Sequence, residues 1–236
     1  MSAKSNIQTM FEEVPGTYEK INHTLTLGLD RIWRKRMVKR VARHGGTLWL
    51  DVCTGTGETA VYLKTQGEDH VHVVALDFTF PMLKQALSKP EAASIDFCLA
   101  DVKKMPFRDE TFDVVTLSFA TRNLNLNRDI LKTTFEELYR VLKPGGLFFN
   151  LETSQPPNPL IRKLFHLVIR LTVFPLGSRV SGSATGYRYL SNTIQRFYEP
   201  SVLASILKEA GFATVSFRQW MLGAVALHQS QKTQTL

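Results

Sequence analysis

The chain has 236 residues, of which 44% are hydrophobic and 21% charged, so it can bury a sizeable core and is not a disordered chain. Two independent cores would be crowded at this length, which predicts one domain, with or without a lid. The net charge of +8 favours an anionic partner, such as a nucleic acid, a membrane surface or a phosphorylated ligand, without choosing among them.

The cysteines and the N-terminal residues bear on the location of the protein. Cys53 and Cys98 are too few for a disulfide scaffold, which favours a reducing compartment. The opening residues MSAKSNIQTMFEE lack the apolar run of a secretory signal, and no stretch approaches the roughly 20 apolar residues of a membrane-spanning helix. We therefore expect a cytoplasmic protein that is soluble or at most rests on a membrane surface.

The first forty or so residues are predicted to form helices. Residues 18–27 form one that ends at Gly28, and Asp30 is suited to be the N-cap of the next. Apolar residues in the second helix recur at spacings of three and four, so one face is apolar and the other basic. The apolar positions are Ile32, Trp33, Met37, Val38 and Val41. Residues 44–46 (His-Gly-Gly) end this helix.

The middle of the chain alternates between short apolar runs and helical stretches, which predicts an α/β fold with a doubly wound, mostly parallel sheet and right-handed crossovers. The predicted parallel strands are residues 48–52, 71–76, 95–99, 112–117 and 147–151. Helices are expected over residues 58–65, 81–87 and 128–142. An antiparallel pair, 213–220 and 223–228, completes seven strands, and the polar tail from residue 229 is expected to fray.

Between the fifth strand and the last helix, residues 155–197 are predicted to form a lid rather than a separate domain. They begin with a stiff Gln-Pro-Pro-Asn-Pro break, and residues 160–174 are apolar with a few bases. The single domain is thus expected to comprise N-terminal helices (1–44), a central core (45–152), the lid, and a C-terminal helix with the strand pair (198–229).

The positive charge is concentrated in two segments without acidic residues, one on each side of this core. Residues 31–43 hold seven Lys or Arg and residues 153–198 hold six, so the rest of the chain is net acidic. For 31–43 we expect a covering helix whose bases face water. For 160–174 two interpretations stay open: a covering helix of the same kind, or a lid that rests on anionic lipid headgroups.

A glycine loop follows the first strand and opens the next helix. Residues 50–58 have the sequence LDVCTGTGE, in which Gly55 and Gly57 let the backbone approach a ligand and leave the helix N-terminus free for an anionic group. Asp77 ends the second strand twenty residues after Gly57, where a carboxylate meets a ribose hydroxyl pair. A plain tight turn with a capping Asp is the alternative. Residues 45–152 are thus the expected cofactor-binding core.

The glycine loop alone fits a nicotinamide dinucleotide as well as it fits S-adenosylmethionine. Two features further along the chain favour S-adenosylmethionine. Asp101 follows the third strand, where a carboxylate can accept from an adenine amino group. Residues 140–147 (RVLKPGGL) join a helix to the fifth strand through a Pro-Gly-Gly turn. The combination is characteristic of class I S-adenosylmethionine methyltransferases and is much more specific than the glycine loop.

Further motifs follow one another along the chain. They are residues 11–33 (FEEVPGTYEKINHTLTLGLDRIW), 51–57 (DVCTGTG), 105–107 (MPF), 118–123 (SFATRN), 151–159 (LETSQPPNP), 187–190 (YRYL) and 223–228 (GAVALH). In this order they resemble the signatures of the ubiquinone/menaquinone biosynthesis C-methyltransferase family (the UbiE type). No single motif is decisive, but so many in one order rarely coincide. The resemblance implies a Rossmann-like class I methyltransferase fold, S-adenosyl-L-methionine as cofactor and a prenylated quinol as substrate.

The resemblance also implies which positions contact the cofactor. They are Asp51, Thr56, Asp77, Phe78, Asp101, Val102 and Ser118, with Gly55 and Gly57 shaping the cofactor-binding loop. Three positions depart from the pattern: Cys53 stands where the wider class has its first glycine, Glu58 where the family prefers Asp, and Ala120 where the family has Gly in its F-G-x-R-N block. These exchanges leave cofactor binding as an expectation and bear on the identity of the acceptor.

Methylation of a ring carbon makes a specific demand on the site, because such a carbon is a poor nucleophile unless an adjacent phenol, with a pKa of about 10, loses its proton. A cation or hydrogen-bond donor aimed at the developing phenolate lowers that cost. Arg122 is the expected donor because it follows the fourth strand at the carboxyl edge, where ligands bind in open α/β sheets. Asn123 is expected to orient the ring oxygen or a water molecule. Tyr18 and Tyr187 are candidates to close over the ring or relay a proton.

Structural roles compete with these catalytic ones. The two tyrosines are as well suited to packing, and Asn123 to capping a turn. Arg122 would in that case form an ion pair only, with Asp109, Asp129 or Glu152 as the partner. Glu152 is itself a candidate general base, because it ends a strand at the same edge. The sequence leaves these alternatives open.

No metal site is predicted. His70 and His72 flank the start of a strand with one residue between them and no third ligand nearby, and the two cysteines form no C-x-x-C motif. Methyl transfer from S-adenosylmethionine needs no metal.

The expected partners are a prenylated quinol or another small aromatic molecule, and an anionic membrane at the lid. No nucleic acid is expected, because no aromatic-basic RNA-binding module is appended. A homodimer is left open by the sequence, as are the benzoquinol or naphthoquinol nature of the ring and the length of the tail. Three rival functions stay open: a methyltransferase of RNA or of another phenol, a non-catalytic lipid-presenting subunit of a quinone-synthesis assembly, and a nicotinamide-dependent reductase.

Overall fold

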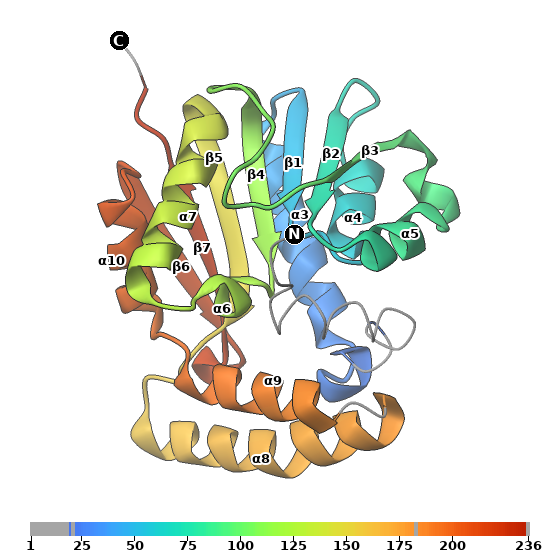
Figure 1. Ribbon diagram of the computed structural model, residues 1–236. Coiled ribbons are helices and arrows are strands. Elements are labelled where there is room, and N and C mark those ends of the chain that lie inside the picture. The colour runs from blue at the N-terminus through green and yellow to red at the C-terminus, as the bar shows by residue number, and fades with distance from the viewer. Residues whose placement is uncertain (1–18, 20–21, 182–183, 235–236) are drawn as a thin grey trace, which may run out of the picture.

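The computed structural model describes residue 19, residues 22–181 and residues 184–234 (Figure 1). A seven-stranded sheet forms its centre, with the strands in the order β3-β2-β1-β4-β5-β7-β6. The strands are β1 (Leu48–Val52), β2 (His72–Asp77), β3 (Ile95–Leu99), β4 (Phe112–Ser118), β5 (Leu142–Thr153), β6 (Thr214–Trp220) and β7 (Val225–Gln231).

Helices precede, connect and follow these strands. They are α3 (Leu29–His44), α4 (Glu58–Gln66), α5 (Phe80–Leu87), α6 (Thr121–Leu124), α7 (Arg128–Val141), α8 (Pro159–Ser181), α9 (Ala184–Arg196) and α10 (Pro200–Glu209), with the short 3₁₀ turns η1 (Pro90–Ser94) and η2 (Met221–Gly223). The predicted helices over 58–65, 81–87 and 128–142 are confirmed to within a residue at each end.

The strand pairing is parallel from β3 through β2, β1 and β4 to β5, whereas β7 pairs antiparallel with both β5 and β6. This pairing confirms the mostly parallel, seven-stranded sheet and the final antiparallel pair. The strand order reverses between β1 and β4, where the chain has crossed from one half of the sheet to the other. In open α/β sheets, ligands bind beyond the carboxyl ends of the strands at this point.

Helices cover both faces of the sheet and give it two hydrophobic cores. On one face, α7 and α10 pack on the sheet with side chains such as Phe135 and Leu203. On the other face, α3 and α4 contribute side chains such as Met37 and Leu63. Neighbouring residues of β1 divide between the cores, Leu50 joining the first and Trp49 the second, as the alternation of side chains in a buried strand requires. The sheet and these helices fix the positions of the loops at its carboxyl edge.

The segment expected to be a lid forms α8 and α9, which pack side by side across the end of the sheet toward which the arrowhead of β4 points (Figure 1). Apolar side chains of α8 are exposed at helical spacing, and they are Leu160, Leu164, Leu167, Val168 and Leu171. None of the helices among the described residues is long and apolar enough to cross a membrane.

The structure corrects three expectations about the second helix of the N-terminal region. Gly28, with φ of 75°, is the N-cap of α3, and Asp30 lies buried inside the first turn instead of capping it. Ile32 is 45% exposed and does not belong to the buried face, while Trp33 does. Arg34, expected among bases that face water, is only 8% exposed. The tertiary structure explains why Arg34 is buried: Asp30 of α3 and Glu58 of α4 both lie beside its guanidinium.

Two further expectations were wrong in the C-terminal half. The tail was expected to fray from residue 229, but β7 continues to Gln231 and pairs with Phe149, Phe148 and Leu147 of β5. The Pro-Gly-Gly turn lies within β5, which begins at Leu142, and the register with β4 shifts there. Pairing to a neighbouring strand, rather than local polarity, determines both boundaries.

Candidate active site

A cavity of about 320 Å³ lies at the carboxyl ends of β1, β2 and β4, where the strand order reverses. Its walls come from the glycine loop after β1, the residues that follow β2, β3 and β4, and the N-terminal region. The residues predicted to contact the cofactor all line it, and they are Asp51, Thr56, Asp77, Phe78, Asp101, Val102 and Ser118. Gly55, one of the two glycines predicted to shape the loop, lines it as well. We call this space the polar cavity.

The glycine loop turns sharply between β1 and α4. Cys53, Gly55 and Gly57 have positive φ of 52°, 57° and 80°. A Cβ atom at Gly57 would lie 2.9 Å from the Cβ of Ala86 in α5, so both the backbone conformation and the packing require glycine there. Gly57 caps α4 and does not line the polar cavity, so it shapes the loop. The left-handed backbone at Cys53 also explains why the wider class prefers glycine at this position.

The carboxylate of Asp77 holds the loop in place. Its Oδ2 accepts from the backbone N–H of Gly55 at 2.8 Å, and its Oδ1 accepts from that of Thr79 at 2.9 Å. Burial raises the pKa of this carboxyl, although the backbone donors oppose the shift. Asp77 therefore joins the end of β2 to the loop and still presents an edge to the cavity.

Asp51, at the end of β1, is almost fully buried beneath the loop. It accepts from the hydroxyls of Thr54 and Thr116, each at 2.6 Å. Burial raises the pKa of Asp51 to about 6, with the two hydroxyls and the Arg34 cation acting in the opposite direction. The carboxyl thus titrates closer to neutral pH than an ordinary aspartate.

Thr56 is tied to the N-terminal region. Its Oγ1 donates a short hydrogen bond to Oε1 of Glu19, which also accepts from Nζ of Lys89 at 2.5 Å. Glu19 lines the polar cavity as well. Three distant parts of the chain therefore meet at this side of the cavity.

The remaining predicted positions close the cavity on its far side. Val102 is buried, whereas Asp101 is exposed and accepts from the backbone N–H of Lys103 at 3.0 Å. Ser118 ends β4, and its buried Oγ has no hydrogen-bond partner within the described part of the chain. A buried hydroxyl facing a cavity indicates a ligand that supplies the missing partner.

The short helix α6 carries two of the four side chains that were predicted to act on the substrate, Arg122 and Asn123. Nη1 of Arg122 donates to Oε1 of Glu152 at 2.6 Å, and the backbone N–H of Arg122 donates to Oε2 at 3.2 Å. Asp109, another of the expected partners, pairs with Arg140 instead. Asn123 lines the polar cavity, whereas Arg122 does not. Of the three partners that the sequence left open for Arg122, the ion pair is therefore formed with Glu152.

A second cavity of about 410 Å³ lies between α3, α8 and α9. Most of its lining is apolar and comes from Leu25, Leu29, Trp33, Ile161, Phe165, Ile169, Val173, Leu190 and Ile194, among others. Its charged side chains are Asp30, Arg34 and Arg122. We call this space the apolar cavity. Its composition suits a hydrophobic ligand with a few polar atoms.

The two cavities share a wall made by Asn22, Arg34 and Phe119. Phe119 has a left-handed backbone, with φ of 58°, and its ring lies 4.9 Å from the guanidinium carbon of Arg34. A ligand in the polar cavity and one in the apolar cavity would therefore meet at these three side chains.

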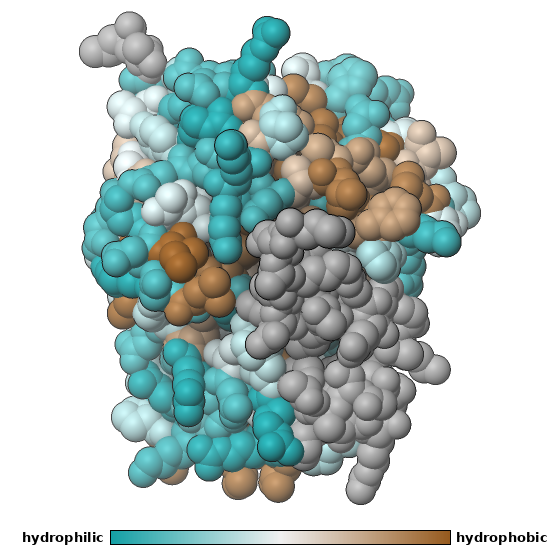
Figure 2. Space-filling view, in the orientation of Figure 1, coloured by the Kyte–Doolittle hydropathy of each residue, from teal (hydrophilic) through white to brown (hydrophobic). Residues whose placement is uncertain are grey.

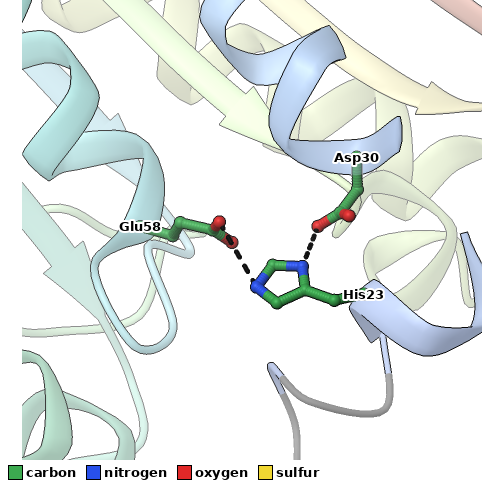
Figure 3. Close-up of side chains that lie close together, drawn as sticks. All are labelled: His23, Asp30 and Glu58. Carbon is green, nitrogen blue, oxygen red and sulfur yellow. Dashed lines mark hydrogen bonds and ion pairs between the residues drawn. The ribbon is translucent and has the colours of Figure 1, made fainter. Parts of the chain in front are cut away.

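The imidazole of His23 lies between the carboxylates of Asp30 and Glu58, which are also the ion-pair partners of Arg34 (Figure 3). Nδ1 is 2.8 Å from Asp30, and Nε2 is 3.5 Å from Glu58. By composition these three residues could hold a metal ion. Arg34 is already 2.8 Å from Asp30 and 3.5 Å from Glu58, and Arg31 donates to Nε2 of His23, so cations and donors occupy the ligand atoms. We assign no metal to the cluster.

The two predicted tyrosines cannot be placed. Tyr18 lies outside the described residues, and Tyr187 lies in α9, but its side chain is outside the described part of the structure. Both roles therefore stay predictions.

Sequence reasoning missed Asn22 and Arg34, which the structure brings into the shared wall. The sequence did contain a signal for these two residues, because Asn22 lies within the N-terminal motif at residues 11–33 and Arg34 directly follows Trp33, the last residue of that motif. The spacing of bases on α3 instead indicated a solvated face.

Comparison with known proteins identifies the chain more closely. The model of the ubiE/COQ5 methyltransferase family matches residues 1–232. A demethylmenaquinone methyltransferase of Clavibacter sepedonicus is 38% identical over 96% of this chain and 90% of its own length. A ubiquinone/menaquinone biosynthesis C-methyltransferase UbiE of Ruegeria sp. strain TM1040 is 36% identical, with the same two shares.

Solved structures agree with the fold. An S-adenosylmethionine-dependent methyltransferase of Thermotoga maritima, described as a possible histamine N-methyltransferase, has a TM-score of 0.69 at 16% identity and covers 97% of this chain and 100% of its own. Another from Aquifex aeolicus has a TM-score of 0.56 at 20% identity, over 82% of this chain and 87% of its own. The predicted class I methyltransferase fold is thus confirmed, and the nucleic-acid, reductase and non-catalytic readings are not favoured. The chain belongs to the ubiE/COQ5 methyltransferase family.

Proposed function

We propose that the chain transfers a methyl group from S-adenosylmethionine to a ring carbon of a prenylated quinol in ubiquinone or menaquinone biosynthesis. The observation that carries this proposal is the pair of cavities, one polar and one apolar, that share the wall of Asn22, Arg34 and Phe119. The names of the relatives support it, since they refer to demethylmenaquinone and to ubiquinone and menaquinone biosynthesis.

The polar cavity fits S-adenosylmethionine by the chemistry of its donors and acceptors. Asp77 is suited to the ribose hydroxyls and Asp101 to the adenine amino group, while Val102 and Phe78 offer apolar surface to the base. Asp51, Glu19 and Glu58 make the opposite side acidic, which suits an ammonium group. The buried Oγ of Ser118 supports the fit, because it has no partner among the described residues.

When bound, the cofactor would supply a methyl group on sulfur that a ring carbon can attack, so that a C–C bond forms, the C–S bond breaks with its electrons staying on sulfur, and the ring proton passes to a base or to water. The residues of this chain supply position and electrostatics. The apolar cavity is suited to hold the ring and the start of the tail and to exclude water, which strengthens every hydrogen bond to a phenolate oxygen. Asn123 lines the polar cavity, so the role proposed for it is to orient a water molecule there or a ring oxygen that reaches the shared wall.

Arg122 remains a candidate to hold a ring oxygen inside the apolar cavity. Its guanidinium is fixed by Glu152, and both residues are buried. A fixed donor loses little entropy when it binds an oxygen, but the neighbouring carboxylate offsets part of its charge. Glu152, the other candidate, lines neither cavity. As a base it would accept a proton and lose the charge that pairs with Arg122, so the two roles exclude each other.

We further propose that α8 contacts an anionic membrane, from which the quinol enters. The exposed apolar side chains of α8 form a face of the helix, and hydrophobic atoms protrude at the lower margin of Figure 2, where α8 lies in Figure 1. Lys163 and Arg170 on the same helix are exposed and suited to lipid phosphates.

The experiment that tests the function is an anaerobic assay with short-chain demethylmenaquinol and its benzoquinol counterpart. A labelled methyl group should appear on the ring carbon, as measured by mass spectrometry. Calorimetry with S-adenosylhomocysteine is run in parallel. Binding of this nucleoside without turnover on either quinol contradicts the acceptor, and absence of binding contradicts the cofactor.

A further inference from the structure

Arg34 has a buried hydrogen-bond donor that the fold does not use. The residue is 8% exposed and lines both the polar and the apolar cavity. Its Nε has no hydrogen-bond partner within the described part of the chain. A buried N–H group without a partner costs free energy, so its retention indicates a partner that arrives with a ligand.

The rest of the guanidinium is held in place from several sides. Nη1 lies 2.8 Å from Asp30 and 3.5 Å from Glu58, and the guanidinium carbon lies 4.9 Å from the centre of the Phe119 ring. Asp30 is in turn held by Nδ1 of His23 at 2.8 Å (Figure 3). The guanidinium is therefore preorganised, which is what a donor needs if it is to stabilise charge without reorganising first.

The position of Arg34 follows from the two cavities. A methyl group that passes from a ligand in the polar cavity to one in the apolar cavity must cross the shared wall of Asn22, Arg34 and Phe119. Under the proposed function, the ring carbon that accepts the methyl group would lie at this wall, and the ring oxygen on the adjacent carbon would lie beside it. We propose that the Nε–H of Arg34 donates a hydrogen bond to that oxygen, an inference that rests on the proposed function. Arg34 would then be a catalytic residue of the reaction.

The charges around Arg34 favour a ring oxygen over the cofactor carboxylate as its partner. Asp30 and Glu58 already face the guanidinium, and Asp51 lies close enough to feel its charge. A third full carboxylate would be repelled by these groups. A phenolate that shares its charge with the ring is repelled less, and a phenol hydroxyl hardly at all.

Arg34 and Arg122 then serve different oxygens of the quinol. Arg122 lines the apolar cavity alone, so it is placed for the oxygen across the ring. That oxygen is meta to the methylated carbon and does not activate it. The oxygen beside the methylated carbon does activate it once it is ionised, and this is the one assigned to Arg34.

The test uses Arg34→Lys in the full chain, with Arg36→Lys on the exposed face of the same helix as the matched control. Lysine keeps a cation for Asp30 but lacks the planar donor set of arginine. We expect kcat on the demethylated quinol to fall about 100-fold in Arg34→Lys and to stay within twofold in the control. The rise of kcat with pH should move to higher pH, because the phenol loses its stabilised ionised form. The Kd for S-adenosylhomocysteine should change less than threefold.

Two results would overturn the inference. A large loss of S-adenosylhomocysteine affinity would assign Arg34 to the cofactor carboxylate, and unchanged kcat with an unchanged pH profile would deny it any role in transfer. Failure of the wild-type protein to methylate any quinol would instead contradict the proposed function. Should the lysine variant lose its thermal unfolding transition, Arg34→Gln, which keeps an N–H group for Asp30, carries the same comparison.

Discussion

Arg122 and Glu152 form a buried ion pair in which one carboxylate accepts from both the side chain and the backbone of the arginine, at 2.6 and 3.2 Å. The pair joins α6 to the end of β5 beneath the apolar cavity. It fixes the short helix that carries Asn123 toward the other cavity. Its contribution to stability and its contribution to catalysis can be separated.

We expect Glu152→Gln to lower the free energy of unfolding by about 3 kcal/mol, because it removes a buried carboxylate that pairs with the Arg122 guanidinium at 2.6 Å. Replacing both residues, in Arg122→Met with Glu152→Met, should recover most of that loss but not the turnover. Denaturant unfolding and quinol turnover measure the two effects. Glu209→Gln, which breaks the exposed pair with Arg128, is the control and should cost less than about 1 kcal/mol. Normal turnover in the double variant would show that the pair has a structural role only.

Asp51 is expected to make stability depend on pH in a direction opposite to most aspartates. Burial raises its pKa to about 6 in the folded state, above the unfolded value near 3.9. The ionised form therefore costs stability, fully above about pH 6 and not at all below about pH 4. Asp51→Asn should raise the free energy of unfolding by about 3 kcal/mol at pH 7.5 and leave it unchanged at pH 4. An equal effect at both pH values would contradict the raised pKa.

The same carboxyl should link cofactor binding to pH. If ionised Asp51 favours the ammonium group of the cofactor, the affinity for S-adenosylhomocysteine falls as the pH drops below about 6. Calorimetry between pH 5 and pH 8 measures this fall, and Asp51→Asn should bind more weakly at pH 8 and show a flatter profile. A wild-type affinity that does not change with pH would refute the link.

Gly57 tests the geometry of the glycine loop. An alanine there must adopt φ near 80° and place its Cβ 2.9 Å from that of Ala86, so we expect Gly57→Ala to lose about 2–3 kcal/mol of stability and to weaken S-adenosylhomocysteine binding. Gly28→Ala is the control, because Gly28 has φ of 75° but open space around its Cβ position. It should lose about 1 kcal/mol, and thermal unfolding compares the two. Equal losses would show that packing against α5 does not matter.

The exposed face of α8 tests the proposed membrane contact. Leu167 and Leu171 do not line either cavity, and they are 51% and 65% exposed. The double variant Leu167→Glu with Leu171→Glu should abolish salt-sensitive flotation with anionic liposomes, because it removes apolar area and adds negative charge. Leu87→Glu on α5, at a position 57% exposed, is the control and should float like the wild type. Flotation of the α8 variant at wild-type levels would contradict the proposal.

The local patterns in the sequence were sufficient for the sheet and for the polar cavity. Short apolar runs bounded by turn residues predicted the parallel strands, because strands buried on both faces must be apolar throughout. Asp51, Asp77, Asp101 and Ser118 each lie at or just beyond the carboxyl end of a strand, so the fold class alone brings them to one edge. The sequence by itself therefore determined three things: the mostly parallel sheet, the residues at its carboxyl edge that suit a cofactor, and membership of a methyltransferase family.

Only the tertiary structure decided which charges are buried and which cavities meet. Arg34 looks like one of seven bases on a solvated helix, yet Asp30 and Glu58 from two elements surround it. Arg122 had three candidate partners, and Glu152 is the one that the pairing of β4 with β5 brings beside it. The physical reason is that the spacing of apolar and charged residues along a helix gives only the average polarity of each face. The partner of a single charged side chain depends on residues far away in the chain. The wall between the polar and apolar cavities likewise depends on residues that are far apart in the chain.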